Sequence, residues 1–147
     1  MYSLEDNRIR TAAFNWLVDQ VALHGDVLPR DLLAKGFIID DKRVPLLGPQ
    51  GIFKPQVLRD IPLSITTAPG GPYDDAFGQD GLLHYRYRGN DPEHRDNQGL
   101  RQAMKYHVPL VYFHGIVPGK YLASWPVYIV ADDPIGLTVT AAVDDAS

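Results

Sequence analysis

The 147-residue sequence contains no cysteine, which excludes disulfide bonds and thiolate metal sites. It also lacks a run of about 18 apolar residues, the minimum for a membrane-spanning helix. Near the N-terminus, Glu5 and Asp6 stand where a secretory signal would carry basic residues. We therefore expect a soluble, cytoplasmic protein with no membrane partner.

Motifs for catalysis and metal binding are missing as well. The sequence contains no His-x-x-x-His pair, no Gly-x-Ser-x-Gly elbow, no phosphate-binding Gly-x-x-x-x-Gly-Lys loop and no His-Asn-His metal finger. Asp74 and Asp75 are adjacent, so on an extended segment their carboxylates would point apart and make a poor catalytic pair. We expect a chain that binds without cleaving and that needs neither metal nor cofactor.

Positive charge is present but unevenly distributed. The net charge is −4, yet residues 121–147 hold four aspartates and no Lys or Arg, so the first 120 residues are neutral. Between His84 and Lys105 the basic residues outnumber the acidic ones. This segment predicts either a face that contacts phosphates, with salt-dependent strength, or an ordinary solvated surface of mixed charge.

Length and hydrophobic periodicity predict one α+β domain. A chain of 147 residues with 45% hydrophobic content is long enough for one compact core. Helical spacing predicts helices over 4–24, about 29–36 and 97–106, and β-forming runs predict strands at 37–39, 44–47, 63–66, 82–87, 108–113, 121–130 and 137–143. The first 36 residues are thus expected to form a helical extension. The dense Pro and Gly punctuation from residue 48 onward favours a β-barrel or sandwich core over about 37–147.

The most informative stretch runs from Thr67 to Gly89. Two glycines, paired carboxylates and several tyrosines lie together there, which is the chemical set needed to hold a flat, hydrogen-bonding ring such as a nucleobase. The candidate pocket residues are Gly70, Gly71, Tyr73, Asp74, Asp75, Tyr85 and Tyr87.

The order of these motifs resembles the SRA (SET- and RING-associated) domain, a PUA-like reader of modified cytosine. The similarity covers about residues 50–130: Gly-Gly, Tyr and paired acids, a Tyr-x-Tyr-x-Gly strand, Asn-x-x-Leu-x-x-Ala, and a Pro-Leu-Val-Tyr strand. The whole chain is similar to the N-terminal part of bacterial HNH restriction endonucleases, whose C-terminal nuclease is not part of this sequence. The resemblance implies a twisted β-barrel with flanking helices that binds methylated double-stranded DNA.

Reading a cytosine by extruding it from the duplex needs specific groups. Tyr73 and Tyr87, with Tyr85 as a substitute, would replace the lost base stacking. Asp75 or Asp74 would accept a hydrogen bond from the cytosine amino group, and the glycines would let backbone amides approach the ring. Strand alternation places the tyrosines on one face and Arg86 and Arg88 on the other. The expected DNA-backbone contacts are Lys54, Arg86, Arg88, Arg95 and Arg101.

Each feature also has a plainer interpretation. The Gly-Gly-Pro-Tyr-Asp-Asp segment is typical of a turn, Tyr85 and Tyr87 are typical of core packing, and Asn97 is typical of a helix cap. Two alternative functions therefore stay open. One is a PUA-like module that binds RNA or unmodified nucleic acid, and the other is a small-molecule or protein-interaction barrel with structural tyrosines. Homodimerisation of the full-length protein is also left open.

Overall fold

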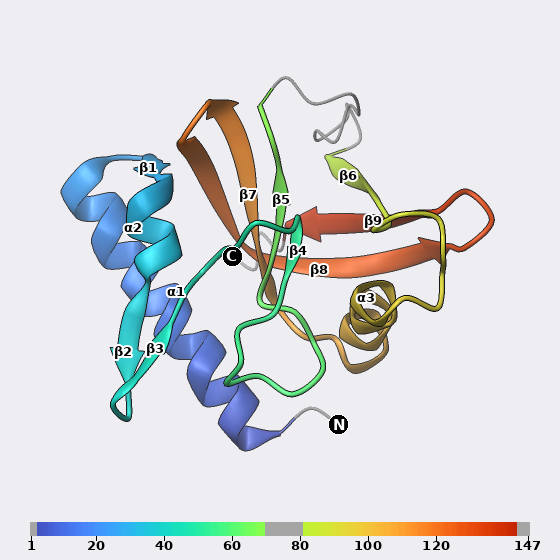
Figure 1. Cartoon of the computed structure of the whole chain (residues 1–147), viewed down its shortest axis with the longest axis horizontal. Helices are drawn as coiled ribbons and strands as arrows, with labels where there is room; N and C mark the ends of the chain where they lie inside the picture. The colour runs from blue at the N-terminus through green and yellow to red at the C-terminus, as the bar shows by residue number, and fades with distance from the viewer. Residues whose placement is uncertain (1–2, 70–80, 144–147) are drawn as a thin grey trace.

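The structure is a computed structural model that describes residues 3–69 and 81–143 (Figure 1). Its elements are, in chain order, α1 (Leu4–His24), β1 (Val27–Pro29), α2 (Arg30–Lys35), β2 (Phe37–Ile39), β3 (Lys42–Val44), β4 (Ile52–Phe53), β5 (Ser64–Thr67), β6 (Leu82–Arg86), α3 (Arg95–Tyr106), β7 (Leu110–Val117), β8 (Lys120–Asp133) and β9 (Thr138–Val143). Among the described helices, none is long and apolar enough to cross a lipid bilayer.

The first helix forms where its sequence predicts. Ser3 caps α1 by accepting a backbone hydrogen bond from the first turn, and Gly25 ends the helix with a φ of 87° that glycine adopts without strain. Ile9, Ala13 and Leu17 recur every four residues and are buried. They form the apolar face that packs on the sheet.

A short hairpin, β2–β3, follows α2. Phe37 pairs with Val44 across it, and Asp40 and Asp41 make the turn with φ values of 52° and 63°. Two residues of positive φ match the twist of a tight hairpin. The prediction of a second strand over 44–47 is wrong, because this turn uses only two residues and pairing stops at Val44.

The described part of the chain also forms a curled, seven-stranded sheet. Its strand order is β4-β5-β7-β8-β9-β6, with β1 added on β8. Only β5 and β7 run parallel among these pairs. The sheet curls so far that Tyr85 on β6 donates a 2.8 Å hydrogen bond to the carbonyl of Thr66 on β5, near the opposite edge. The resulting half-barrel confirms the predicted α+β class and is compatible with a twisted barrel. The prediction of helices alone in residues 1–36 misses β1.

Strand β7 separates two hydrophobic clusters. Leu110 and Tyr112 face the inside of the curl, whereas Val111 and Phe113 face the cluster covered by α1 and α2. All four side chains are buried. An apolar residue at every position is what a strand buried on both faces requires.

Helix α3 covers the inside of the half-barrel (Figure 1). Leu100 and Ala103 are fully buried there. The helix ends at Tyr106 and is capped by His107, whose φ of 55° is left-handed. The His107 ring stacks on Tyr128 of β8 at a centroid distance of 4.1 Å. The C-terminal end of α3 is therefore held against the sheet by the stacked rings.

Candidate functional site

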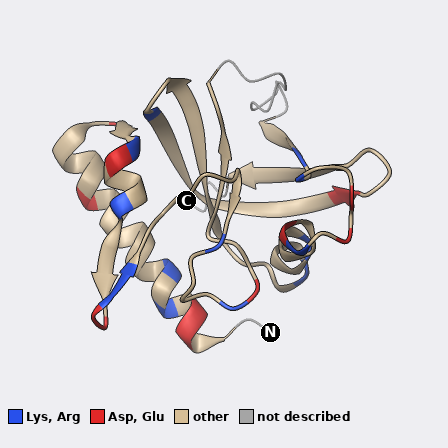
Figure 2. Ribbon diagram, in the orientation of Figure 1, with Lys and Arg blue, Asp and Glu red and all other residues tan. Residues whose placement is uncertain are grey.

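A cleft of about 430 Å³ lies between the chain around β4 and the start of α3. One wall is formed by the segment 49–56, the other by Arg88, Arg95 and Asp96, and Asp60 and Pro62 complete the lining. Figure 2 shows basic residues in the loop after β4 and on α3. The fold thus brings together three of the predicted phosphate-binding residues, Lys54, Arg88 and Arg95.

The three basic residues of the cleft differ in how they are held. Lys54 donates a 2.7 Å hydrogen bond to the carbonyl of Leu58. Arg88 pairs with Asp96 at 2.8 Å. Arg95 is exposed and makes no ion pair among the described residues. An anion entering the cleft would therefore meet two basic groups, Lys54 and Arg95, that pair with no acid among the described residues.

Asn97 fixes the position of Arg88. Its side chain is fully buried, accepts a 2.8 Å hydrogen bond from the Arg88 amide and donates to the carbonyls of Arg88 and Asp91. These bonds tie the connection after β6 to the first turn of α3. The prediction that Asn97 caps the helix is wrong, because the cap is His94, whose Nδ1 accepts from the Asp96 amide.

Tyr87 and Arg101 belong to a different cluster, inside the half-barrel. The Tyr87 ring is 6% exposed, and its hydroxyl donates to the carboxylate of Asp132. Burial, and then this hydrogen bond, raise the pKa of Tyr87. Arg101 lies over the Tyr87 ring, and its Nε is 3.3 Å from Asp132 Oδ2 in an ion pair without hydrogen-bond geometry. Arg101, predicted to contact DNA, is therefore engaged internally.

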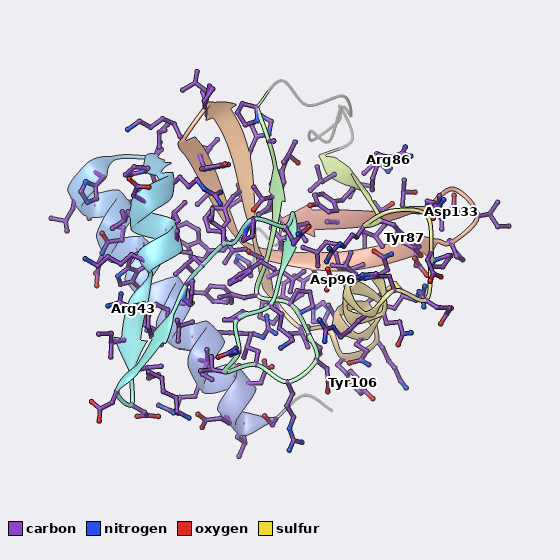
Figure 3. The ribbon with its side chains drawn as sticks, viewed as in Figure 1. Arg43, Arg86, Tyr87, Asp96, Tyr106 and Asp133 are labelled. Atoms are coloured by element: carbon purple, nitrogen blue, oxygen red, sulfur yellow. The ribbon has the colours of Figure 1, made fainter. Side chains whose placement is uncertain are left out.

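The alternation predicted for β6 is confirmed. Tyr85 and Tyr87 are buried, whereas Arg86 and Arg88 are exposed. Figure 3 shows Arg86 and Tyr87 at the end of β6, with Tyr87 on the side nearer to α3. Both tyrosine rings belong to the core cluster inside the curl. The surroundings of Tyr85 and Tyr87 therefore fit the interpretation that these rings pack the core.

The predicted loop residues Gly70, Gly71, Tyr73, Asp74 and Asp75 lie outside the described residues. Their neighbours along the chain are described. The strand before them ends at Thr67, whose Oγ1 accepts a 2.9 Å hydrogen bond from the Tyr112 hydroxyl.

Several cleft residues are absent from the sequence predictions. They are Gln50, Phe53, Gln56, Asp60 and Asp96. No local pattern of the sequence assigns a role to Gln50, Gln56 or the Phe53 ring. They become part of one site only because the loop after β4 meets the start of α3.

The chemistry of the cleft suits a nucleotide better than a metal or a purely apolar ligand. It combines three cations with two acids, Asp60 and Asp96, two glutamine amides and one half-buried ring, Phe53, so the cations outnumber the acids. A second hollow of about 400 Å³ at the start of α1 is lined by Glu5, Asp6 and Asp60 with Arg59, so its acids disfavour an anion. Among the described residues, no group of His, Asp and Glu side chains is arranged to hold a metal ion.

Comparison of the chain with models of known protein families, with curated proteins and with solved structures found no match.

Proposed function

We propose that this chain is a DNA-binding module of the SRA and PUA-like type, which reads a modified cytosine extruded from the duplex. The observation that carries the proposal is the cleft in which Lys54, Arg88 and Arg95 meet. The module binds without cleaving, and in a longer protein it would direct an HNH nuclease to methylated DNA.

The size and charge of the cleft support nucleic acid as the ligand. Its volume of about 430 Å³ lies within the range of about 300–1,000 Å³ that small-ligand sites occupy. Basic side chains around it would anchor phosphates, which supply most of the affinity of proteins for DNA. The glutamine amides can both donate to and accept from a base edge.

The base-holding groups come from the segment between β5 and β6. In the proposal Tyr73 stacks on the flipped base, and Asp75 or Asp74 accepts from its amino group. Tyr85 and Tyr87 support this pocket from the core, since their rings are buried. The Tyr85 hydrogen bond to Thr66 joins the strands that carry the two ends of the segment.

A second function is favoured by that same burial. If Tyr85 and Tyr87 only pack the core and Tyr73 holds no base, the chain retains a basic cleft without a selective aromatic pocket. It would then bind RNA or unmodified DNA through phosphate contacts.

One titration series separates these functions. The 147-residue chain is titrated with otherwise identical duplexes that contain 5-methylcytosine or cytosine, and with a structured RNA, between about 50 and 200 mM salt. The proposed function predicts tightest binding to the methylated duplex. It also predicts that Asp75→Asn abolishes this preference while leaving binding to the unmodified duplex unchanged.

Substitutions in the cleft test the phosphate contacts. Lys54→Ala and Arg95→Ala should each weaken binding to both duplexes equally and lower the salt slope by about 0.9. Lys42→Ala, on the distant hairpin, removes the same charge as a control. Equal affinity for methylated and unmethylated DNA would eliminate base reading, and salt-independent binding would eliminate phosphate contacts.

A further inference from the structure

The outer face of α3 carries a polar stripe without acidic residues. Arg95, Gln98, Gln102 and Lys105 follow one another at three- and four-residue spacing, which places them on one side of a helix. Leu100 and Ala103 are buried on the opposite side. Arg95, Gln98 and Lys105 are exposed, whereas Gln102 is half-buried with its Oε1 buried, so the exposed part of the stripe is formed by the other three residues.

The acids near α3 lie beside the stripe and are paired. Asp96 is about 100° around the helix from Arg95 and binds Arg88. Glu93 precedes the helix. Its carboxylate lies 3.6 Å from Arg101 and accepts a 3.4 Å hydrogen bond from Gln98 at the edge of the stripe. The two charged residues of the stripe, Arg95 and Lys105, are therefore both positive.

The stripe continues the proposed binding cleft. Arg95 lines the cleft and is also the first residue of the stripe. From Arg95 to Lys105 the helix rises about 15 Å, at about 1.5 Å per residue. This length matches about four base-pair steps of duplex DNA, so the two cations can reach different phosphates of one backbone.

Helix α3 is also held rigidly at both ends. Asn97 ties its first turn to the connection after β6, and the ring stack of His107 on Tyr128 fixes its end. Side chains on a fixed helix lose less conformational freedom on binding than side chains on a loop.

From the stripe, its continuity with the cleft and its rigidity, we infer that the outer face of α3 is a second DNA-contact surface that lies along the sugar–phosphate backbone. The inference rests on the proposed function. It identifies Lys105, which lies outside the cleft, as an individual phosphate contact, whereas the sequence predicts only that the whole segment from His84 to Lys105 contacts phosphates or is solvated.

The test compares Lys105 with Lys42 in the 147-residue chain. Tyr106, next to Lys105, lies below α3 in Figure 3, whereas Arg43, next to Lys42, lies on the hairpin at the opposite side of the molecule. Affinity for the methylated duplex is measured against salt for Lys105→Ala, Lys105→Glu, Lys42→Ala and Lys42→Glu. Thermal unfolding confirms that each variant folds.

The expected result is a salt slope about 0.9 smaller for Lys105→Ala, weaker binding still for Lys105→Glu, and no change for either Lys42 variant. If the Lys105 variants keep the salt slope of the wild type while Arg95→Ala lowers it, the second DNA-contact surface is overturned and the cleft still stands as the phosphate-binding site. If neither Arg95→Ala nor Lys105→Ala changes DNA binding, both the proposed function and the second DNA-contact surface are overturned. Equal losses for the Lys105 and Lys42 pairs would show an effect of net charge alone and overturn the inference.

Discussion

At the scale of single residues, the most consequential side chain outside the site is Arg10. It is completely buried, pairs with Asp6, and donates to the carbonyls of Ile61, Pro62 and Pro109. A buried guanidinium is tolerated only when its donors are satisfied. Arg10 therefore fastens α1 to two distant segments of the chain.

Replacing Arg10 should be far more harmful than replacing its neighbour Arg8. Arg10→Met leaves Asp6 buried without its partner, which we expect to lower the free energy of unfolding by about 3–5 kcal/mol. Arg8→Met removes an exposed pair with Glu5 and Asp40, expected to contribute about 0–1 kcal/mol. Urea denaturation of both variants measures the difference. Similar small losses for the two would contradict the anchoring role of Arg10.

Tyr87→Phe should reveal the raised pKa of Tyr87. At neutral pH the loss of the hydrogen bond to Asp132 should cost about 1–3 kcal/mol. Because burial raises the Tyr87 pKa in the folded state, the hydroxyl is deprotonated first in the unfolded chain as pH passes about 10. Its contribution is complete below that pH and falls above it. The stability gap between wild type and Tyr87→Phe should thus narrow above pH 10 in denaturation experiments. A gap that stays constant would contradict this.

At the scale of elements, the packing of α3 depends on a glycine inside the helix. A Cβ on Gly99 would lie 2.9 Å from the Asp60 carbonyl oxygen and 2.9 Å from Pro62 Cδ. The helix can approach the loop before β5 this closely only without a side chain at that position.

Gly99→Ala should destabilise the protein even though alanine favours helices. In a helix interior this change normally stabilises by about 0.5–1 kcal/mol. Here overpacking against a backbone carbonyl should instead cost about 1–3 kcal/mol. Gln98→Ala, on the exposed face, should change stability by less than about 0.5 kcal/mol. Thermal unfolding distinguishes the two, and a stabilised Gly99→Ala variant would disprove the close packing.

At the scale of the whole molecule, one sheet supports both hydrophobic clusters. Val111 and Phe113 lie in a cluster with residues of α1, while Leu110 and Tyr112 belong to the cluster under α3. β1, from the same N-terminal segment as α1, pairs with β8. The N-terminal residues and the curled sheet thus form one continuous structure.

Removal of residues 1–36 should therefore abolish folding. The truncated chain would expose Val111 and Phe113, which are fully buried in the intact protein. It would also lose β1, which pairs with β8. We expect no cooperative thermal transition by circular dichroism and poor dispersion of amide signals by NMR. A sharp transition for residues 37–147 alone would show that the first 36 residues are a dispensable extension.

The sequence predicts local features well where one periodicity dominates. Ser3, Gly25 and the spacing of apolar residues predict the approximate bounds of α1, and the alternation from Tyr85 to Arg88 predicts which side chains are buried. β4 has only two residues and β1 only three, so neither contains a repeat long enough to detect. The buried roles of Arg10 and Asn97 depend on carbonyls that lie elsewhere in the chain.

By itself, the sequence determined the α+β class, most of the element positions and the inward or outward direction of side chains along β6, because these follow from contacts between near neighbours. Only the tertiary structure decided that β5 runs parallel to β7, that α1 shares a core with the sheet, and that Lys54 meets Arg88 and Arg95 in one cleft. Such contacts join distant segments, and their free energy comes from burial and hydrogen bonding that no local pattern records.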